Sequence, residues 1–498
     1  MTDPTPVEVP IAETLGPSSV ATGPIEAELG SAELGGSAKL NRGGISWSVF
    51  EGARDPYVIL MTIFVFMPYV SASMIGDPVK GQEAISALQQ YVGWTVFATG
   101  PFLGASIDKL GPRKTWLAAT VIAMVPLIGA LWFAKPDLTG LSIMATLGIL
   151  YCVNVLFAWS EILHNSMLIR AAGLKGAHAA SGLALSLGNA ASVVALAFTA
   201  WAFALPGKVT WAWVPAHPLF GLSAASHEPE RVVAILAAVI FAVGALPIFL
   251  FTPDAPKTGV PVLRAFKEGA ADLWNMLTTV RRYGDAMAYL VSRMFFFDGM
   301  NGVLFFYGVL AAGVMKWGPL ELLASGIVGS IIATFGGQVG RWLDHRIGPK
   351  NALRLEIFMT ILALIGLLGM SPDTILYIWH YDATAHAPIW SGPVFRTLPS
   401  LIFLMVGFTN SIFITAQYAS ARTALTRLTP PAQTGAFFGI YGLSGVATAW
   451  LAPGLVNIGT RVTHSQQGGF ASVILLMAVG LVGLFFVKGG GREVTQVD

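Results

Sequence analysis

The sequence GASIDKLGPRK at residues 104–114 recurs in altered form as GRWLDHRIGPK at residues 340–350. Each copy has a glycine, an aspartate four residues later, a second glycine, and basic residues at its end. Each also lies between two long apolar segments, so we expect each to form a turn between two helices. Because the copies lie near equivalent points, they indicate that the chain consists of two related halves.

The composition predicts that both halves lie in a membrane. Of the 498 residues, 54% are hydrophobic and only 11% are charged, whereas soluble domains have roughly 25% charged residues. The apolar residues occur in runs of about twenty, the length that crosses the hydrocarbon core of a bilayer. These features predict an all-α membrane protein. The single cysteine, Cys152, excludes a disulfide within the chain.

Twelve transmembrane helices are expected, in two pseudo-symmetric six-helix bundles. The predicted spans are 56–76, 84–106, 115–134, 141–163, 178–204, 231–252, 286–313, 320–341, 351–371, 399–419, 435–459 and 468–488. The corresponding regions are a disordered N-terminal tail at 1–44, an N-terminal bundle at 45–252, a charged linker at 253–285, a C-terminal bundle at 286–488 and a tail at 489–498. The first tail is rich in Pro, Gly, Ala, Ser and Glu, a composition that cannot bury a core.

The lysine and arginine residues are distributed unevenly between the two ends of the predicted spans. Of the 29 such residues, 21 lie on the side of both termini and the linker, 7 lie on the other side, and Arg293 lies within a span. Basic residues concentrate on the cytoplasmic side, so we expect both termini and the linker there. Two related halves in a membrane are typical of secondary transporters, whose substrate site lies between the halves.

The repeated turn has residue types that suit a contact between the halves. The first glycine of each copy follows another glycine four residues earlier, as Gly100 and Gly104 and as Gly336 and Gly340. Each pair shares one helical face, which lets another helix approach closely. The aspartate that follows can face a helix N-terminus or a basic residue. We predict a conformational latch; the alternative is a plain cytoplasmic loop. The predicted latch residues are Gly104, Asp108, Arg113, Gly340, Asp344, Lys350 and Arg422.

These turns resemble the loop between the second and third helices, and its counterpart in the second half, of the major facilitator superfamily. The family pattern is Gly-x-x-x-Asp-Arg/Lys-x-Gly followed by basic residues. The first copy matches this pattern, and the second has one extra residue before Gly348. The resemblance implies a monomer that works by alternating access, with helices one, four, seven and ten lining a central cavity.

A narrower resemblance covers most of the chain. It is carried by WSVFEGARDPY (47–57), RMFFFDGMN (293–301), QYASAR (417–422), FFGIYGLSGVAT (437–448), Pro430 and Pro453. These stretches are similar to the branch that contains the fungal vacuolar amino-acid effluxer associated with autophagy and its bacterial relatives. The resemblance implies a small polar solute such as an amino acid. It also favours a bacterial inner membrane, with a vacuolar membrane as the alternative.

Ionisable side chains within a span are candidate functional groups, because they cost free energy unless they are paired or face water. The first span begins with Glu51 and Asp55 on one face, with Arg54 beside them. These residues are either an ion or substrate contact at the cytoplasmic mouth or helix-capping and interface charges.

In the fourth span, Asn154, Glu161 and Asn165 share a face. Glu161 either exchanges a proton during transport or pairs with His164 or Arg170 to fix the loop that follows.

The seventh and tenth spans also contain polar residues. Asp298 and Asn301 share a face of the seventh span, and Asp298 is either protonatable or the partner of Arg293 in a structural ion pair. Asn410 and Gln417 share a face of the tenth span, where they either bind a polar substrate or join helices.

We therefore predict a secondary transporter in which Asn154, Asn301, Asn410 and Gln417 contact the solute. Proton coupling is assigned to Asp298, Glu161, Asp55 and Glu51. The rival interpretations are a non-transporting receptor with this fold and a membrane-embedded enzyme that acts on lipid.

No nucleotide-binding Gly-x-x-x-x-Gly-Lys-Ser/Thr motif, zinc-peptidase motif or serine-hydrolase motif is present. The prediction is therefore no enzyme, no cofactor and no nucleic-acid partner. His380, Asp382 and His386 could bind a metal, but they have no second cluster, and we predict no metal site.

Overall fold

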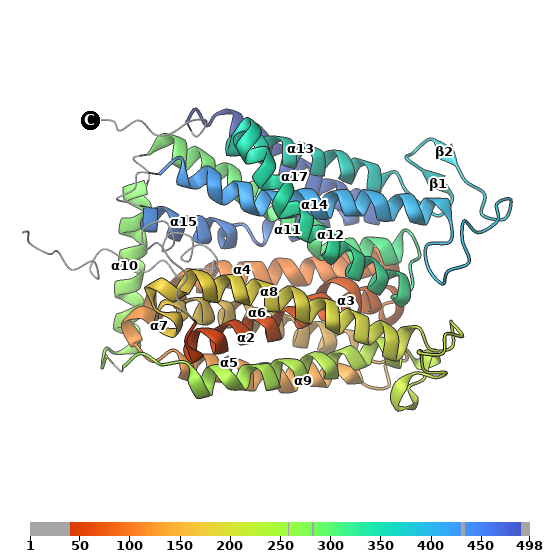
Figure 1. Cartoon of the computed structure of the whole chain (residues 1–498), viewed down its shortest axis with the longest axis horizontal. Helices are drawn as coiled ribbons and strands as arrows, with labels where there is room; N and C mark the ends of the chain where they lie inside the picture. Colours follow the sequence, from red (N-terminus) through yellow and green to blue (C-terminus); the bar gives the residue numbers. More distant parts are fainter. Residues whose placement is uncertain (1–39, 257, 281–282, 430–433, 490–498) are drawn as a thin grey trace, which may run out of the picture.

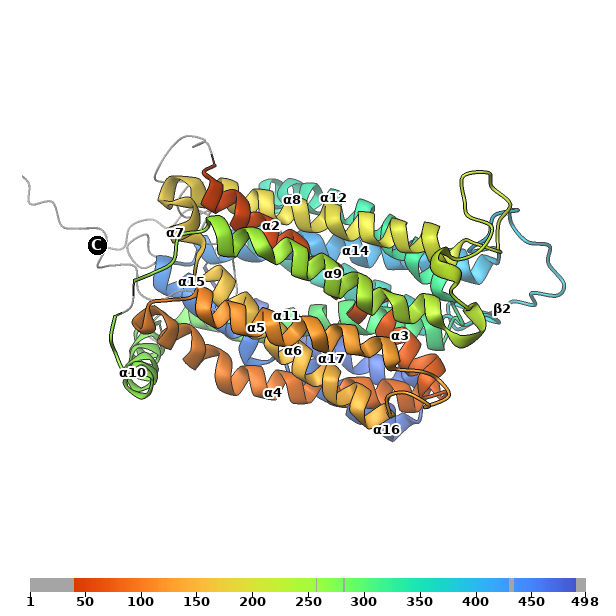
Figure 2. The same cartoon turned by 90° about the horizontal axis from the view of Figure 1, so that it is seen from below.

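The computed structural model describes residues 40–256, 258–280, 283–429 and 434–489. Two bundles of helices lie side by side with their long axes parallel, and α10 (Val262–Val280) lies across one end (Figures 1 and 2). We call this end the linker face. The opposite end, the hairpin face, carries the antiparallel strands β1 (Thr374–Ile375) and β2 (Trp379–His380). The predicted all-helical fold of two bundles is confirmed.

The N-terminal bundle begins with a long, irregular helix. It consists of α2 (Arg42–Tyr57), η2 (Val58–Phe64), α3 (Phe66–Tyr69) and η3 (Val70–Met74). Both η2 and η3 are π-helical, and Pro56, which has no N–H to donate, lies just before η2. Short π segments often mark functional sites. In this helix, 72% of the most apolar window is buried, which indicates a central position.

The remaining helices of this bundle follow in chain order. They are α4 (Pro78–Leu110), α5 (Lys114–Ala130) with η4 (Leu131–Phe133), α6 (Ile143–Asn165), the short α7 (Leu168–Ala172), α8 (Leu174–Thr199) with η5 (Ala200–Ala204), η6 (Leu219–Gly221), η7 (Ala224–Ser226) and α9 (Glu228–Phe251).

The C-terminal bundle is built from α11 to α17. Its helices are α11 (Gly284–Gly313), α12 (Pro319–Ile347), α13 (Pro349–Leu368), α14 (Leu398–Thr426), α15 (Thr434–Ala447), α16 (Leu451–Thr463) and α17 (Gln466–Phe485). The predicted eleventh span, 435–459, is divided into α15 and α16, with a turn at residues 448–450 between them.

Ten described segments are long and apolar enough to cross a membrane. The helix α4 and the pair α15–α16 occupy the positions of the other two predicted spans, so the structure is consistent with twelve. The first span begins earlier than the prediction of residue 56, because the Asn41 side chain accepts a hydrogen bond from Gly44 N at 2.6 Å and caps α2. Of the predicted tails, residues 1–39 and 490–498 lie outside the described part.

The two bundles are joined by hydrogen bonds at the hairpin face. Gln82 of α4 donates to Thr460 Oγ1 at 2.8 Å and to the Gln466 carbonyl at 2.9 Å. Asn457 donates to the Glu83 carbonyl at 2.8 Å, and Gln466 donates to the Pro78 carbonyl at 2.8 Å. These contacts hold the start of α4 against α16 and α17.

Candidate functional site

A central cavity of about 520 Å³ lies between the two bundles. Its wall comes from α2, η2, α4, α6 and α8 on one side and from α11, α14, α15 and α16 on the other. The four helices that the family resemblance implies, the first, fourth, seventh and tenth, all contribute. The polar and charged lining residues are Glu51, Asp55, Tyr57, Thr62, Gln89, Asn154, Glu161, Asn165, Ser181, Arg293, Asn301, Tyr418, Arg422 and Tyr441.

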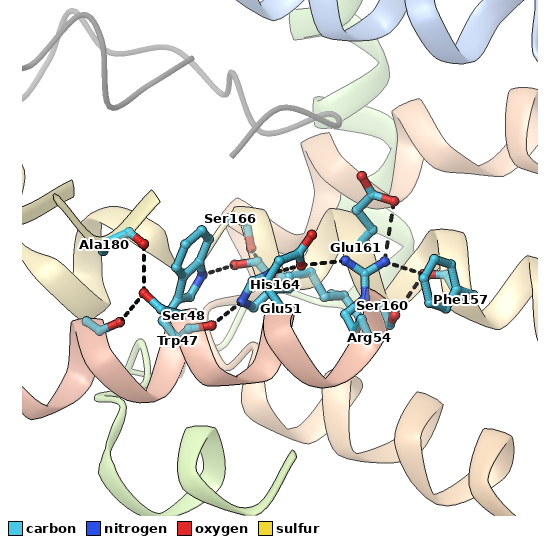
Figure 3. Close-up of polar contacts among 12 residues, drawn as sticks. Trp47, Ser48, Glu51, Arg54, Phe157, Ser160, Glu161, His164, Ser166 and Ala180 are labelled. Carbon is cyan, nitrogen blue, oxygen red and sulfur yellow. Dashed lines mark hydrogen bonds and ion pairs between the residues drawn. The ribbon is translucent and has the colours of Figure 1, made fainter. Parts of the chain in front are cut away.

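Arg54 organises the carboxylates of the N-terminal wall (Figure 3). Its side chain is buried, and its Nη1 lies 2.7 Å from Glu51 Oε2 while its Nη2 lies 3.3 Å from Glu161 Oε2. The guanidinium also lies over the Phe157 ring, 4.3 Å from the centroid. One cation therefore serves two carboxylates from α2 and α6. The predicted alternative, a pairing of Glu161 with His164 or Arg170, is replaced by this ion pair with Arg54.

His164 is the residue that sequence reasoning undervalued (Figure 3). Its ring is fully buried and stacks on Trp47 with 4.2 Å between centroids. Its Nε2 lies 2.9 Å from the Trp47 carbonyl oxygen, and its Nδ1 lies 3.3 Å from Glu51 Oε2. A carbonyl oxygen only accepts, so Nε2 must be the protonated nitrogen. Nδ1 and the carboxylate then face each other as two acceptors unless one further proton lies between them.

Two other predicted residues of the N-terminal half line the cavity. Asn154 Oδ1 accepts a hydrogen bond from the Tyr57 hydroxyl at 2.8 Å. Its Nδ2 is buried and has no hydrogen-bond partner among the described residues, so a donor is left for a ligand. Asp55 lies one turn after Glu51 and also contributes to the lining. The structure therefore brings together Glu51, Asp55, Asn154 and Glu161.

On the opposite wall, only one of the predicted solute contacts reaches the cavity. Asn301 lines it, and its Oδ1 accepts a hydrogen bond from the Tyr418 hydroxyl at 3.3 Å. Asn410 and Gln417 are buried away from the lining. Gln417 donates to Thr360 Oγ1 at 2.7 Å, because its face of α14 packs against α13. The predicted solute contacts of Asn410 and Gln417 therefore lack support from this placement.

The same face of α14 meets a carboxylate that sequence reasoning missed. Glu356 of α13 is completely buried and accepts a hydrogen bond from Ser420 at 2.8 Å. Its other oxygen has no hydrogen-bond partner among the described residues. The available signal was a lone carboxylate within the predicted span 351–371.

Asp298 is also buried outside the lining of the cavity. Its Oδ2 accepts a hydrogen bond from Ala452 N at 2.6 Å, in the first turn of α16. A carboxylate at a helix N-terminus is favourable, because it meets the positive end of the helix dipole. Arg293 is directed to α15 instead, so the structure does not contain the Arg293–Asp298 pair that the sequence left open. Asp298 thus stabilises the break between α15 and α16.

Replacing Asp298 by alanine should lower the free energy of unfolding by about 1–3 kcal/mol, because a buried N–H loses its acceptor. Asparagine keeps an oxygen acceptor, so Asp298→Asn should cost less than about 1 kcal/mol. Thermal unfolding of both variants in the same detergent measures the difference. Equal losses for the two variants would contradict the capping role.

Three of the predicted latch residues make contacts within one half or with the linker. Gly340 lets α12 approach α14, since a Cβ there would lie 3.0 Å from Ala416 Cα. Lys350 Nζ donates to the carbonyls of Val487 and Lys488 at 3.1 and 3.2 Å, at the end of α17. The Arg113 backbone N donates to Asp254 Oδ1 at 2.8 Å.

The other latch residues are placed as follows. Gly104 is buried in α4, Asp344 lies in the last turn of α12, and Arg422 lines the cavity. The side chain of Asp108 lies outside the described part of the structure. A latch across the halves therefore stays a prediction.

The segment between α13 and α14 contains His380, Asp382 and His386, for which the sequence analysis predicts no metal site. Asp382 Oδ1 accepts hydrogen bonds from the Thr384 hydroxyl and N–H, and these bonds lower the pKa of the aspartate. His386 Nδ1 lies 2.8 Å from the Asp382 carbonyl oxygen. Among the described residues, no group of three or more His, Cys, Asp or Glu side chains is placed to hold a metal ion.

Comparison with known proteins shows what the chain resembles. Residues 95–491 match a family profile described as "Vacuole effluxer Atg22 like". An uncharacterised transporter of the major facilitator type from Bacillus subtilis, YxiO, is 22% identical over 480 residues, which cover 91% of this chain and 95% of that protein. Autophagy-related protein 22-2 of Neosartorya fischeri is 22% identical over 225 residues, which cover 44% of this chain and 34% of that protein.

Solved structures show the same fold at low sequence identity. A crystal structure of the nucleoside transporter NupG has a TM-score of 0.56 and 12% identity, covering 89% of this chain and 97% of that chain. A D-xylose–proton symporter has a TM-score of 0.53 and 13% identity, covering 90% and 97%. The similar proteins are transporters of the major facilitator type and not enzymes.

Proposed function

Because the chain belongs to the family described as vacuole effluxer Atg22 like and has the fold of major facilitator transporters, we propose that it moves a small polar solute by alternating access. The observation that carries this proposal is the central cavity, whose lining includes polar and charged side chains from both halves. The hydrogen bonds described above between the halves lie at the hairpin face, at one end of the molecule. A solute bound between the walls would then reach one side or the other as the halves rock.

The proposed solute is of the size and polarity of an amino acid. The lining combines charged and amide groups with the aromatic rings of Phe157, Phe297 and Phe305. Such a site suits a solute with polar groups at one end and an apolar side chain at the other. The family description supports transport, since the name of the matching family is that of an effluxer.

Proton coupling is proposed to act through Glu51 and His164. Their facing acceptor atoms, 3.3 Å apart, favour one shared proton. Its loss would leave a carboxylate and a lone pair in repulsion and would weaken the contact of Glu51 in α2 with His164 in α6. The previously assigned Asp298, Glu161 and Asp55 stay candidates, and Glu161 shares Arg54 with Glu51.

The proposal is tested in proteoliposomes with a solute found by thermal-shift screening of amino acids, short peptides, sugars and organic acids. A ligand at 100 times its dissociation constant stabilises the folded protein by about 2.7 kcal/mol, which such a screen detects. A pH gradient should then drive accumulation in the wild type. Glu51→Gln and His164→Gln should abolish accumulation and keep solute counterflow, because they remove the shared proton and not the cavity.

His227→Gln is the matched control, since His227 forms a similar pair with Glu230, at 3.2 Å, outside the cavity at the hairpin face. Gradient-driven accumulation is measured in the same assay for Asp298→Asn, Glu161→Gln and Asp55→Asn. Gradient-driven accumulation in both Glu51→Gln and His164→Gln would refute coupling through this pair. Saturable binding without counterflow in the wild type would refute transport and favour a receptor.

The chain is a multi-pass membrane protein, and its proposed location is a bacterial inner membrane with the linker face in the cytoplasm. The uneven distribution of basic residues supports this orientation. The proposed partners are the solute, protons and the lipid bilayer, and the proposed state is a monomer.

A further inference from the structure

Arg293 lies in the C-terminal wall of the cavity, held in a fixed orientation. Its side chain is almost completely buried, and its Nη1 donates to the Tyr441 carbonyl and to Ser444 Oγ, both at 2.7 Å. The guanidinium lies between two rings, 4.1 Å from the Phe297 centroid and 3.5 Å from the Tyr441 centroid. This packing fixes the plane of the guanidinium before any ligand binds, as expected of a preorganised binding residue.

The charge of Arg293 has no anionic partner among the described residues. Its described hydrogen bonds use Nη1 alone, and its Nε is buried without a partner. Asp298, five residues further along α11, is bound to Ala452 N. A guanidinium does not lose its proton in a protein, and burial of an unpaired charge is costly. The cation is therefore retained at a cost in stability that an anionic ligand would offset.

Arg422 extends the positive charge along the same wall. It comes from α14, lines the cavity and is half-buried, again without an ion-pair partner among the described residues. Tyr418, one turn earlier, packs edge-on against Phe297 and donates to Asn301. The C-terminal wall thus offers two guanidinium groups to a ligand.

The opposite wall has the opposite charge. Glu51, Asp55 and Glu161 lie on it, and Arg54 is the cation that compensates two of them. A ligand with two or more negative charges would be repelled from this wall at close range. A ligand with one negative charge can bind the C-terminal wall without approaching these carboxylates.

We infer that Arg293, with Arg422 on the same wall, forms an anion subsite that binds the carboxylate of a solute carrying a single negative group. The inference rests on the proposed transport function, because it assigns part of the same cavity. Arg293 selects the solute by this charge, and the aromatic rings beside it contact the apolar part. A planar guanidinium matches a carboxylate in geometry, which an ammonium group does not.

The test is equilibrium binding to the purified full-length protein in detergent, with L-leucine, L-leucinamide, L-glutamate and glycerol 3-phosphate as probes. L-leucinamide has the size of leucine and lacks the carboxylate. The wild type should bind leucine at least tenfold more tightly than leucinamide. It should bind glutamate and glycerol 3-phosphate more weakly than leucine. Arg293→Met should remove the preference for leucine over leucinamide, and Arg293→Lys should restore part of it.

Arg461→Met is the matched control, because Arg461 is an exposed arginine of α16 away from the cavity lining. If Arg293→Met does not fold, Arg422→Gln replaces it and should reduce the preference for leucine several-fold. The inference is overturned if the wild type binds none of the carboxylate probes, or binds leucine and leucinamide equally. It is also overturned if glycerol 3-phosphate binds best or if the folded variants keep the wild-type preference.

The two proposals fail separately in this design. Carboxylate binding that depends on Arg293, without counterflow in proteoliposomes, would refute transport and leave the subsite in place. Gradient-driven transport of an uncharged solute that is unchanged in Arg293→Met would support transport and refute the subsite.

Discussion

Replacing Arg54 by methionine should lower the free energy of unfolding by about 3 kcal/mol and abolish transport. Loss of one partner of a buried ion pair costs about 3–5 kcal/mol, and the lower end applies here because the carboxylates are partly exposed. The side chains of Glu51 and Glu161 are 28% and 40% exposed, whereas that of Arg54 is 2% exposed. Methionine keeps much of the contact with Phe157, so the loss of stability measures mainly the removal of the positive charge of Arg54.

Thermal unfolding of the purified variant in detergent measures this change. Arg264→Met is the matched control, because Arg264 of α10 pairs with Glu268 at 2.7 Å on the surface, with its own side chain 73% exposed. Exposed pairs contribute at most about 1 kcal/mol. The double variant Arg54→Met/Glu51→Gln should recover part of the lost stability, since it removes one of the uncompensated carboxylates. A loss no larger than that of Arg264→Met would refute the role of Arg54.

Replacing Gly93 by valine should reduce transport roughly tenfold while the protein still folds. Gly93 lies midway along α4, where a Cβ would lie 2.6 Å from Trp450 N and Cα. Those are backbone atoms at the break between α15 and α16, so no flexible side chain can move aside. Overpacking costs about 1–3 kcal/mol. This cost applies to the conformation in which α4 contacts the break between α15 and α16. The population of that conformation should therefore fall by about tenfold or more.

Uptake into proteoliposomes, with size-exclusion chromatography of the same preparations, separates the effect on transport from misfolding. Gly148→Val is the matched control, because Gly148 is exposed on α6 and a Cβ there meets no atom within 4 Å. Normal uptake by Gly93→Val would show that the halves do not need to approach at this point during the cycle.

Much of the fold was predictable from the sequence, because it depends on long-range composition and on a repeated motif. Apolar runs of fixed length locate helices in a membrane, and the two turns at 104–114 and 340–350 indicate two halves. The break between α15 and α16 was not predicted, since residues 435–459 read as one apolar run. It depends on Asp298 of another helix, which accepts from Ala452 N at 2.6 Å.

Part of the candidate site was predictable from the periodicity of the sequence. Periodicity places residues on a face of a helix, and it correctly grouped Asn154, Glu161 and Asn165 at the cavity. Periodicity does not identify the helix against which that face packs. Gln417 therefore looked like a solute contact and faces α13 instead. The pairing of His164 with Glu51 depends on the approach of α6 to α2, which no local pattern encodes.

The contacts that join the halves at the hairpin face consist of neutral groups. Amides of Gln82, Asn457 and Gln466 donate to carbonyl or hydroxyl oxygens there, whereas the cavity contains the network of Glu51, Arg54 and Glu161. Mobile ions screen charges and leave hydrogen bonds between neutral groups nearly unchanged. Ionic strength should therefore alter solute binding in the cavity while leaving the separation of the halves at the hairpin face almost unaffected.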